Sequence, residues 1–307
     1  MKILLTGGSG MVGKNILNHH RSSDYNFLTP SRNELDLLDK SSVLVYLQTN
    51  LPDTVIHCAG KVGGIQANIL KPVSFLYENM MMGMNIIESS NSVGIPNLIN
   101  MGSSCMYPRN APNPLSEDQI LTGELEPTNE GYAIAKISCS KLCNYIVKEN
   151  SARNYKTLIP CNLYGKYDNF DPIKSHLIPA IIVKISDAIK NNINEVEIWG
   201  DGASRREFMY AEDLASFVFN FIDKIEELPG LINVGLGKDY SIRNYYDEIS
   251  KIMNFSGKFT YDLNKPQGMK QKLIDTKQSA LLGWRARTSL KDGLTQTIEY
   301  YQSEILN

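Results

Sequence analysis

The chain is 307 residues long, enough to bury a large hydrophobic core as one big domain or two unequal ones. Its formal net charge of -2 and its pI near 6.1 exclude a whole-chain attraction to nucleic acid or to an anionic membrane surface. The five cysteines include no C-x-x-C pair, and no apolar run approaches the length of a membrane span. We therefore expect a cytoplasmic protein with reduced thiols and no metal site.

Short apolar strands and amphipathic helices alternate through the first half of the chain. The predicted strands cover residues 2–6, 26–29, 55–58, 97–101 and 156–160. The predicted helices between them cover residues 11–18, 41–50, 75–93 and 132–149. This alternation predicts an α/β fold of the Rossmann type, a doubly wound parallel sheet covered on both faces.

The pattern changes after residue 168. A polar loop over 168–175 is followed by a predicted helix at 177–190, a strand at 195–199, a strand end and helix at 208–225, and a helix at 241–253. Only short elements are expected after that. We therefore predict a Rossmann domain of residues 1–168 plus about 207–235. Residues from about 169–206 and 236–307 form a smaller, discontinuous α/β substrate domain.

A glycine loop follows the first predicted strand. Gly7, Gly10 and Gly13 fit G-x-x-G-x-x-G, and Met11 and Val12 open the next helix. Glycines allow a tight turn and the close approach of a pyrophosphate to free N–H groups at a helix N-terminus. The loop by itself is also compatible with a structural turn, but its position between strand and helix favours a dinucleotide site.

The end of the second strand distinguishes NAD from NADP. An acidic residue there accepts from the ribose hydroxyl, whereas a basic one favours the 2′-phosphate. The chain has Arg32 at this point and no acid before Glu34, which favours NADP(H) unless Arg32 is only a solvated surface charge. Asp36 and Ala59–Gly60 are then expected to flank the adenine and the pyrophosphate.

A Tyr-x3-Lys pair offers acid–base chemistry. Tyr132 and Lys136 lie one helical turn apart on the same face, where the ammonium is expected to lower the pKa of the phenol. Upstream, Ser103 offers a hydroxyl that can polarise a carbonyl, and Cys105 offers a second acid or base. These groups suit redox chemistry at a carbon that bears oxygen, and proton abstraction beside it.

The chain resembles the extended short-chain dehydrogenases/reductases and, within them, the GDP-L-fucose synthase family. The resemblance runs nearly end to end, and it is more specific around Cys105 and His176 than at the glycine loop. The matching stretches are Gly10–Gly13, Lys61–Ile65, Ala67–Asn68, Gly102–Pro108, Leu125–Glu130, Tyr132–Lys136, Asn162–Gly165, Asp168–Phe170, Ser175–His176, Ile178–Ala180, Trp199–Gly200 and Arg206–Phe208.

The resemblance implies that the chain reduces the C4 ketone of a GDP-linked 4-keto-6-deoxy-mannose-type sugar with NADPH. Ser103, Tyr132 and Lys136 occupy the positions of the reductase triad. Tyr132 is expected to protonate the C4 oxygen, Lys136 to hold the nicotinamide ribose, and Ser103 to polarise the carbonyl. Asn162 is expected to shape the junction of nicotinamide and sugar.

The same resemblance implies C3/C5 epimerisation before reduction. A C4 ketone acidifies the protons on C3 and C5, because the resulting carbanion spreads onto oxygen. Cys105 and His176 match the base and the acid of the family, and His176 also lies on the cofactor side. Taken alone, the two residues are equally compatible with a buried thiol and a hydrogen-bonded loop histidine.

The nucleotide end of the substrate requires cations and a platform. The resemblance assigns Arg206 and Lys184 to the diphosphate, Trp199 to the guanine or sugar, and Lys272 to the substrate side. Trp199 is also compatible with a core position. The methionine-rich segment 80–84 is expected in helix core or in a homodimer contact.

Two departures from the family leave alternatives open. Ser9 stands where a basic residue is frequent, which leaves the NADP prediction to Arg32, and Lys184 replaces an arginine. The first alternative is a reductase of another GDP-4-keto-sugar, such as a heptose, without epimerase activity. A 4,6-dehydratase needs a carboxylic acid near the serines, and Ser104–Met106 supplies none. A non-enzymatic NADP-binding regulator is the third alternative, although such proteins usually lose the tyrosine or the lysine.

Overall fold

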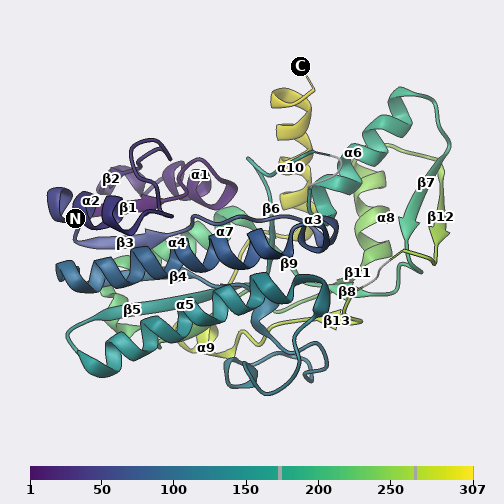
Figure 1. The fold of residues 1–307 in the computed structure, drawn as a ribbon. Helices are drawn as coiled ribbons and strands as arrows, with labels where there is room; N and C mark the ends of the chain where they lie inside the picture. The colour runs from purple at the N-terminus through teal and green to yellow at the C-terminus, as the bar shows by residue number, and fades with distance from the viewer. Residues whose placement is uncertain (172–174, 266–267, 307) are drawn as a thin grey trace.

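A six-stranded parallel sheet forms the centre of the chain. The computed structural model describes residues 1–171, 175–265 and 268–306. The strands follow the order β10-β5-β4-β3-β1-β2, and every neighbouring pair is parallel. Figure 1 shows this sheet in the left-hand part of the molecule. The strands are β1 (Lys2–Thr6), β2 (Asn26–Leu28), β3 (Thr54–His57), β4 (Asn97–Met101), β5 (Asn154–Pro160) and β10 (Leu231–Val234).

Helices cover both faces of the sheet because its strands are apolar on both sides. In β1, Leu4 packs into one hydrophobic core, whereas Ile3 and Leu5 pack into the other. The α/β fold with a doubly wound parallel sheet is thereby confirmed (Figure 1). On the Leu4 side lie α2 (Lys40–Asn50), α4 (Pro72–Val93) and α5 (Glu130–Glu149); on the other side lie α1 (Met11–Leu17) and α7 (Ala211–Phe221).

A second group of elements surrounds a separate core in the right-hand part of Figure 1. Its helices are α6 (Leu177–Lys190), α8 (Ile242–Ile252) and α10 (Leu290–Glu304). Three small sheets join it: β7 (Glu195–Trp199) with β12 (Lys258–Asp262), β6 (Asn162–Tyr164) with β9 (Phe208–Tyr210), and β11 (Tyr240–Ser241) with β8 (Arg205–Arg206) and β13 (Gln271–Lys272). The short helices α3 (Ile65–Leu70) and α9 (Lys277–Leu281) complete the α-helices of the described chain.

Several predicted element limits require correction; α5 and β5 each begin two residues earlier than predicted, and two further differences are larger. Helix α4 begins at Pro72, three residues before the predicted start at 75. The N–H groups of the first helical turn have no acceptor within the helix, so a proline, which lacks an N–H, is well suited to this position. The C-terminal region holds the 15-residue helix α10 where only short elements were predicted. Leu294, Ile298 and Tyr301 are spaced by four and three residues, and they bury one face of this helix.

The predicted division into two domains stays a prediction. Strand β10 extends the central sheet beside β5, in line with the assignment of residues 207–235. Ile274 and Trp284 come from the segment predicted for the substrate domain, and they pack in the core of the central sheet. Of the predicted polar loop 168–175, residues 172–174 lie outside the described residues.

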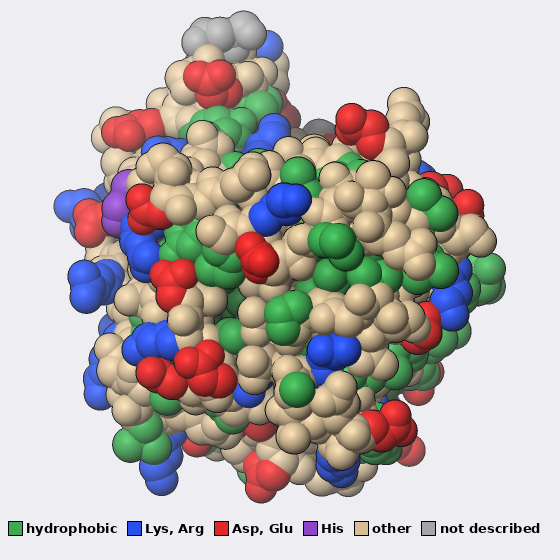
Figure 2. All heavy atoms as spheres, turned by 90° about the vertical axis from the view of Figure 1, so that its left-hand side faces the viewer, with side chains coloured by type: hydrophobic (Ala, Val, Ile, Leu, Met, Phe, Trp, Pro, Cys, Tyr) green, Lys and Arg blue, Asp and Glu red, His purple; other side chains and the backbone are tan. Residues whose placement is uncertain are grey.

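The surface agrees with the near-neutral charge of the chain. On the face shown in Figure 2, acidic and basic side chains are interspersed. None of the described helices combines the length and the apolar character needed to cross a bilayer. All five cysteines are free thiols, as the absence of a paired motif predicts.

Candidate active site

The glycine loop follows β1, the strand from which the strand order of the sheet continues in opposite directions, to β2 on one side and to β3 on the other. Strand β1 pairs with β2 on one side and with β3 on the other, and ligands of such sheets bind at the carboxyl ends of the strands at this point. Gly7 has a φ of +74°, and a Cβ there would lie 2.6 Å from the backbone nitrogen of Ala59. A Cβ on Gly13 would lie 2.3 Å from the carbonyl oxygen of Gly7. Only glycine fits both positions, so the loop keeps a bare backbone cradle that suits a pyrophosphate.

We expect Gly13→Ala to remove cofactor binding and to lower the free energy of unfolding by about 2 kcal/mol or more, because the added methyl overlaps backbone atoms. Gly10→Ala is the matched control for the loss of stability, since Gly10 has a φ of −81° and its Cβ would stay 3.4 Å from the nearest atom. Thermal unfolding and NADPH fluorescence titration measure the two effects. Equal stability of the two variants would contradict the steric origin.

The other predicted cofactor residues surround this loop. Met11 and Val12 are half-buried in the first turn of α1. Arg32 is exposed beyond β2, close enough to lower the pKa of Glu78 on α4. The half-buried Asp36 accepts a hydrogen bond from the backbone nitrogen of Leu38 at 3.0 Å. The ion pairs near this edge of the sheet are formed by Lys40 and Lys61. Among the described residues Arg32 forms no ion pair, so its guanidinium is available to a 2′-phosphate.

The predicted reductase residues meet at the carboxyl end of β4. Ser103 caps the short 3₁₀ helix Ser104–Met106, and its Oγ accepts from the backbone nitrogen of Cys105 at 3.2 Å. Tyr132 lies in the first turns of α5 and hydrogen-bonds Ser103. Lys136 is buried one turn later, where its Nζ donates to the carbonyl oxygen of Met101 at 2.8 Å. The three side chains predicted from sequence therefore form one cluster.

The predicted net lowering of the Tyr132 pKa was wrong. Desolvation raises the pKa of Tyr132 above its ordinary value, and the nearby Cys105 acts in the same sense. The hydrogen bond from Ser103 opposes this shift without reversing it. Lys136 is itself desolvated, which lowers its own pKa, and its Nζ lies 5.7 Å from the centre of the Tyr132 ring. Tyr132 therefore holds its proton at neutral pH and is ready to donate it.

Cys105 lies among nitrogen donors. The Nδ2 of Asn129 is 3.1 Å from its Sγ, and the Nζ of the buried Lys272 is 3.8 Å from the same atom. Burial lowers the pKa of Arg206, while Glu126 and Cys105 shift it in the opposite direction. The thiol, one amide and two cations therefore share one small region, which Lys272 reaches from a strand 167 residues away.

A buried carboxylate fixes the strands that carry these cations. Arg206 and Lys272 are direct partners in the parallel pair β8–β13. The next residue, Glu207, is fully buried and accepts from the backbone nitrogens of Gly237 at 2.7 Å and Ile274 at 2.9 Å. Burial raises the pKa of Glu207 to about 7. The Nδ2 of Asn162 donates to the backbone oxygen of Glu207 at 2.8 Å, so Asn162 belongs to the same framework.

His176 is the residue that precedes the first turn of α6. It is half-buried, and desolvation lowers its pKa, so the imidazole is neutral at pH 7. The loop before α3 lies against this position, because a Cβ on Gly64 would come within 3.1 Å of the carbonyl oxygen of Ser175. A neutral imidazole accepts a proton, and it can donate one only after it has been protonated; the relation of His176 to Cys105 stays a prediction.

Lys184 and Trp199 form a second cluster away from the thiol. The Nζ of Lys184 donates to the carbonyl oxygen of Glu197 at 3.1 Å and lies 5.2 Å from the centre of the Trp199 ring. Trp199 is 41% exposed, which contradicts the alternative that this indole is core. Lys265 is a third member, with its Nζ 5.3 Å from the same ring centre.

Three described residues close in sequence lie at the two clusters. Lys265 lies at Trp199, and Gly268 lies beside Arg206, whose Nη2 is 3.3 Å from a Cβ position on that glycine. Lys272 lies at Cys105. Cations are therefore present both at the exposed indole and at the thiol.

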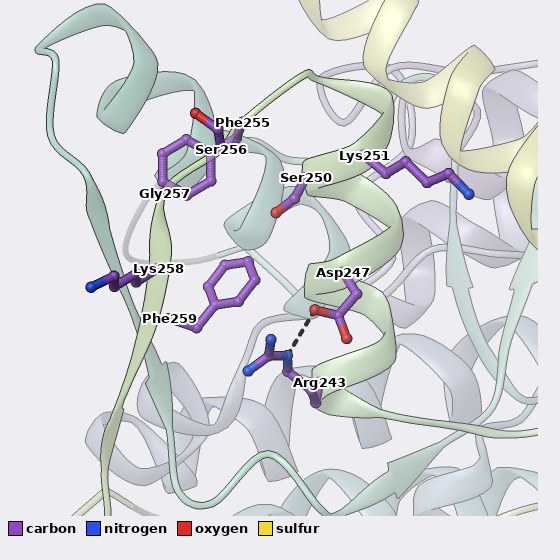
Figure 3. A pocket seen from close by; sticks show the side chains of 9 residues that line it. All are labelled: Arg243, Asp247, Ser250, Lys251, Phe255, Ser256, Gly257, Lys258 and Phe259. Atoms are coloured by element: carbon purple, nitrogen blue, oxygen red, sulfur yellow. Dashed lines mark hydrogen bonds and ion pairs between the residues drawn. The ribbon is translucent and has the colours of Figure 1, made fainter.

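A separate surface hollow contains none of the predicted site residues. It has a volume of about 620 Å³ and lies between α8 and β12 (Figure 3). Arg243 and Asp247, which both line the hollow from α8, form an ion pair at 2.7 Å. In the described part of the chain, no three His, Cys, Asp or Glu side chains are placed to hold a metal ion.

Three residues of the site were missed at the level of sequence. Asn129 lies in a stretch that carries the family resemblance, so that stretch was the signal for it. Glu207 follows Arg206 directly, but nothing local indicates that its carboxylate is buried. Lys265 stands in a polar loop without a helical or strand pattern, and only the folded chain brings it to Trp199.

Known proteins resemble this chain over its full length. Residues 3–235 match the NAD dependent epimerase/dehydratase family. A GDP-L-colitose synthase from Yersinia pseudotuberculosis is 56% identical, with 99% of each chain covered. A GDP-L-fucose synthase from Azorhizobium caulinodans is 47% identical, with 98% of this chain and 96% of the relative covered.

Solved structures give the same result. A GDP-6-OMe-4-keto-L-xylo-heptose reductase from C. jejuni has a TM-score of 0.90 and 30% identity, and the match covers 99% of this chain and 98% of the other. A GDP-mannoheptose C4 reductase from Campylobacter jejuni, solved with NADP bound, has a TM-score of 0.88 and 31% identity, with 98% of each chain covered. The chain therefore belongs to the NAD dependent epimerase/dehydratase family and, within it, to the GDP-L-fucose synthase group of the extended short-chain dehydrogenases/reductases.

Proposed function

We propose that the chain is an NADPH-dependent reductase of the C4 ketone in a GDP-4-keto-6-deoxy-mannose-type sugar, and that it first epimerises C3 and C5. The observation that carries this proposal is the cluster of Ser103, Tyr132 and Lys136 at the end of β4, with Cys105 beside it. The names of the curated relatives support the same substrate class.

The cofactor site combines the glycine cradle with the buried lysine. Gly7, Gly10 and Gly13 leave room for the pyrophosphate, and Lys136 faces the nicotinamide ribose from α5. The exposed Arg32 serves the 2′-phosphate. NADPH, when bound, supplies the hydride to C4.

Reduction requires a proton for the C4 oxygen. Tyr132 retains its phenolic proton because desolvation raises its pKa, so it can donate that proton as negative charge develops on the oxygen. Ser103 lies within hydrogen-bond reach of the same phenol and stabilises the carbonyl oxygen. Lys136 is the nearby cation that stabilises the phenolate left behind.

Epimerisation requires a base on one face of the sugar and an acid on the other. Cys105 removes a proton from C3 or C5, and the electron pair moves onto the C4 oxygen as an enolate. His176, once it has taken up a proton as the imidazolium, returns that proton to the opposite face of the same carbon and is left as the neutral imidazole. Asn129 and Lys272 hold the sulfur of Cys105 in place.

The nucleotide end of the substrate extends from the cations at the thiol to those at the exposed indole. Arg206 and Lys184 bind the diphosphate, and Lys272 reaches the sugar side. Trp199 presents an exposed indole to the guanine or the sugar.

Two related substrates are favoured by specific observations. The 56% identity to a colitose synthase favours a sugar without the C3 hydroxyl, because colitose differs from fucose in this group. The match at 30% and 31% identity to a GDP-6-OMe-4-keto-L-xylo-heptose reductase and a GDP-mannoheptose C4 reductase supports a GDP-4-keto-heptose as the alternative substrate. All three substrates present the same C4 ketone to Tyr132.

The deciding experiment incubates the enzyme with NADPH and each GDP-4-keto-sugar in D2O. Loss of NADPH absorbance together with deuterium at C5, and at C3 where a hydroxyl is present, supports the dual activity. Loss of NADPH without deuterium leaves a C4 reductase. The absence of turnover with all three keto-sugars would refute the proposal.

We also infer a homodimer in the cytoplasm. Val73, Tyr77 and Ile134 are exposed on α4 and α5, which lie side by side in Figure 1, and Met81 and Met84 follow Tyr77 by one and two turns of α4 and are half-buried. An apolar stripe on two adjacent helices suits a symmetric contact. Sedimentation equilibrium tests the dimer, and cell fractionation tests the location.

A further inference from the structure

Two lysines and one indole come together at the end of β7. Strands β7 and β12 are parallel, and Trp199 pairs with Asp262. Lys265 follows Asp262 by three residues, so this pairing brings Lys265 close to the indole. Lys184 reaches the same ring from α6. The two ammonium nitrogens lie 5.2 Å and 5.3 Å from the ring centre. Two cations therefore share one partly exposed aromatic side chain.

Among the described residues, neither ammonium group has a carboxylate oxygen closer than 3.9 Å. Lys184 donates to a backbone carbonyl oxygen, that of Glu197, and Lys265 lies 3.9 Å from Oδ2 of Asp262, at the limit of an ion pair. Desolvation lowers the pKa of Lys184, the charge of Glu197 raises it, and repulsion by Lys265 lowers it. Like charges that approach each other at a half-buried site are stabilised by an anion between them.

We propose that Lys265 is a substrate-binding residue that clamps the diphosphate of the nucleotide together with Lys184, over the exposed edge of Trp199. The inference rests on the proposed function and extends it to a residue with no assigned role. Farther along the sequence, the described Gly268 lies beside Arg206, and Lys272 lies at the Cys105 thiol. Lys265 therefore holds the nucleotide, while Lys272 lies at the reacting sugar.

Trp199 provides the signal for a direct test. The chain has two tryptophans, and the other, Trp284, is 6% exposed in the core of the central sheet. Quenching of the exposed indole by added GDP therefore reports binding at this cluster. The titration uses GDP alone, on the full chain without keto-sugar, and is repeated with guanosine as the uncharged probe.

Lys265→Met keeps the apolar stem over the indole and removes the charge. We expect the Kd for GDP to rise about tenfold or more, because a charge-assisted phosphate contact is lost. Lys265→Arg keeps the charge and is expected to retain most of the affinity. Lys148→Met is the matched control, because Lys148 lies over the ring of Tyr145 at 5.6 Å on α5, away from Trp199. With keto-sugar, Lys265→Met is expected to raise KM at unchanged kcat.

Three results overturn the inference. The first is a GDP affinity of Lys265→Met equal to that of the wild type. The second is an equal loss in Lys265→Met and Lys265→Arg, or a matching loss for guanosine, which would indicate packing around Trp199. The third is a wild-type protein that does not bind GDP. Turnover of the GDP-4-keto-sugar by the wild type distinguishes these outcomes: with turnover, only the role of Lys265 fails, and without it the proposed function fails too.

Discussion

Tyr132→Phe is expected to slow reduction of the C4 ketone by about a thousandfold, because it removes one hydroxyl and little else. The phenol is the proton donor of the Ser103–Tyr132 pair, and its raised pKa keeps that proton in place at neutral pH. Without it, negative charge develops on the C4 oxygen with no proton to compensate it. The measurement is single-turnover oxidation of NADPH at saturating keto-sugar.

The affinity for NADPH separates this effect from a folding defect. The glycine cradle and Lys136 are unchanged in Tyr132→Phe, so fluorescence titration is expected to give the wild-type Kd for NADPH. Tyr46→Phe on α2 makes the same chemical change outside the site and is expected to leave turnover unchanged. A rate for Tyr132→Phe within tenfold of the wild type would remove Tyr132 as the proton donor.

Much of the central sheet was predictable because its elements are local and strongly patterned. Strands β1 and β4 have the predicted limits, and β7 and α6 in the second group do too. Each is a continuous apolar run or a clear helical period, bounded by polar or glycine-rich residues. Such patterns depend on neighbours along the chain, which a sequence displays directly.

The small sheet of the candidate site was not predictable in this way. Strands β8 and β13 have two residues each, and their pairing joins Arg206 to Lys272 across 66 positions of sequence. A two-residue strand has no period to detect. Glu207, which fixes this pair through backbone nitrogens, is charged and yet fully buried, against the usual preference of its type.

The electrostatics of the site depend on burial more than on spacing. One helical turn between Tyr132 and Lys136 was enough to predict that the two side chains are neighbours, and they are. The sign of the pKa shift of Tyr132 was not predictable, because it comes mainly from desolvation by the whole fold. The residue types of a site are therefore read from the sequence more securely than their protonation.

Cys105→Ser is expected to slow the exchange of deuterium into C5 by about a hundredfold or more, because a thiol can supply a thiolate as the base near neutral pH, whereas a serine hydroxyl does not ionise there. The Nδ2 of Asn129 and the Nζ of Lys272 still have an acceptor at this position, so the surroundings need little rearrangement. The measurement is deuterium incorporation by NMR in D2O with GDP-4-keto-6-deoxymannose and without NADPH, which isolates proton transfer from reduction.

The Cys105→Ser variant is expected to lose proton exchange but to retain reduction of the ketone. Cys105 is the neighbour of the Ser103–Tyr132 pair rather than a part of it, so Cys105→Ser is expected to keep reducing the ketone, with C5 left in its original configuration in the product. Cys143→Ser makes the same substitution in the core of α5 and is expected to leave exchange unchanged. Wild-type exchange in Cys105→Ser would exclude the thiol as the base. If Cys105→Ser loses both reduction and exchange, the thiol also shapes the ketone site. A residue that acts only as the base for C5 has no part in hydride transfer to C4.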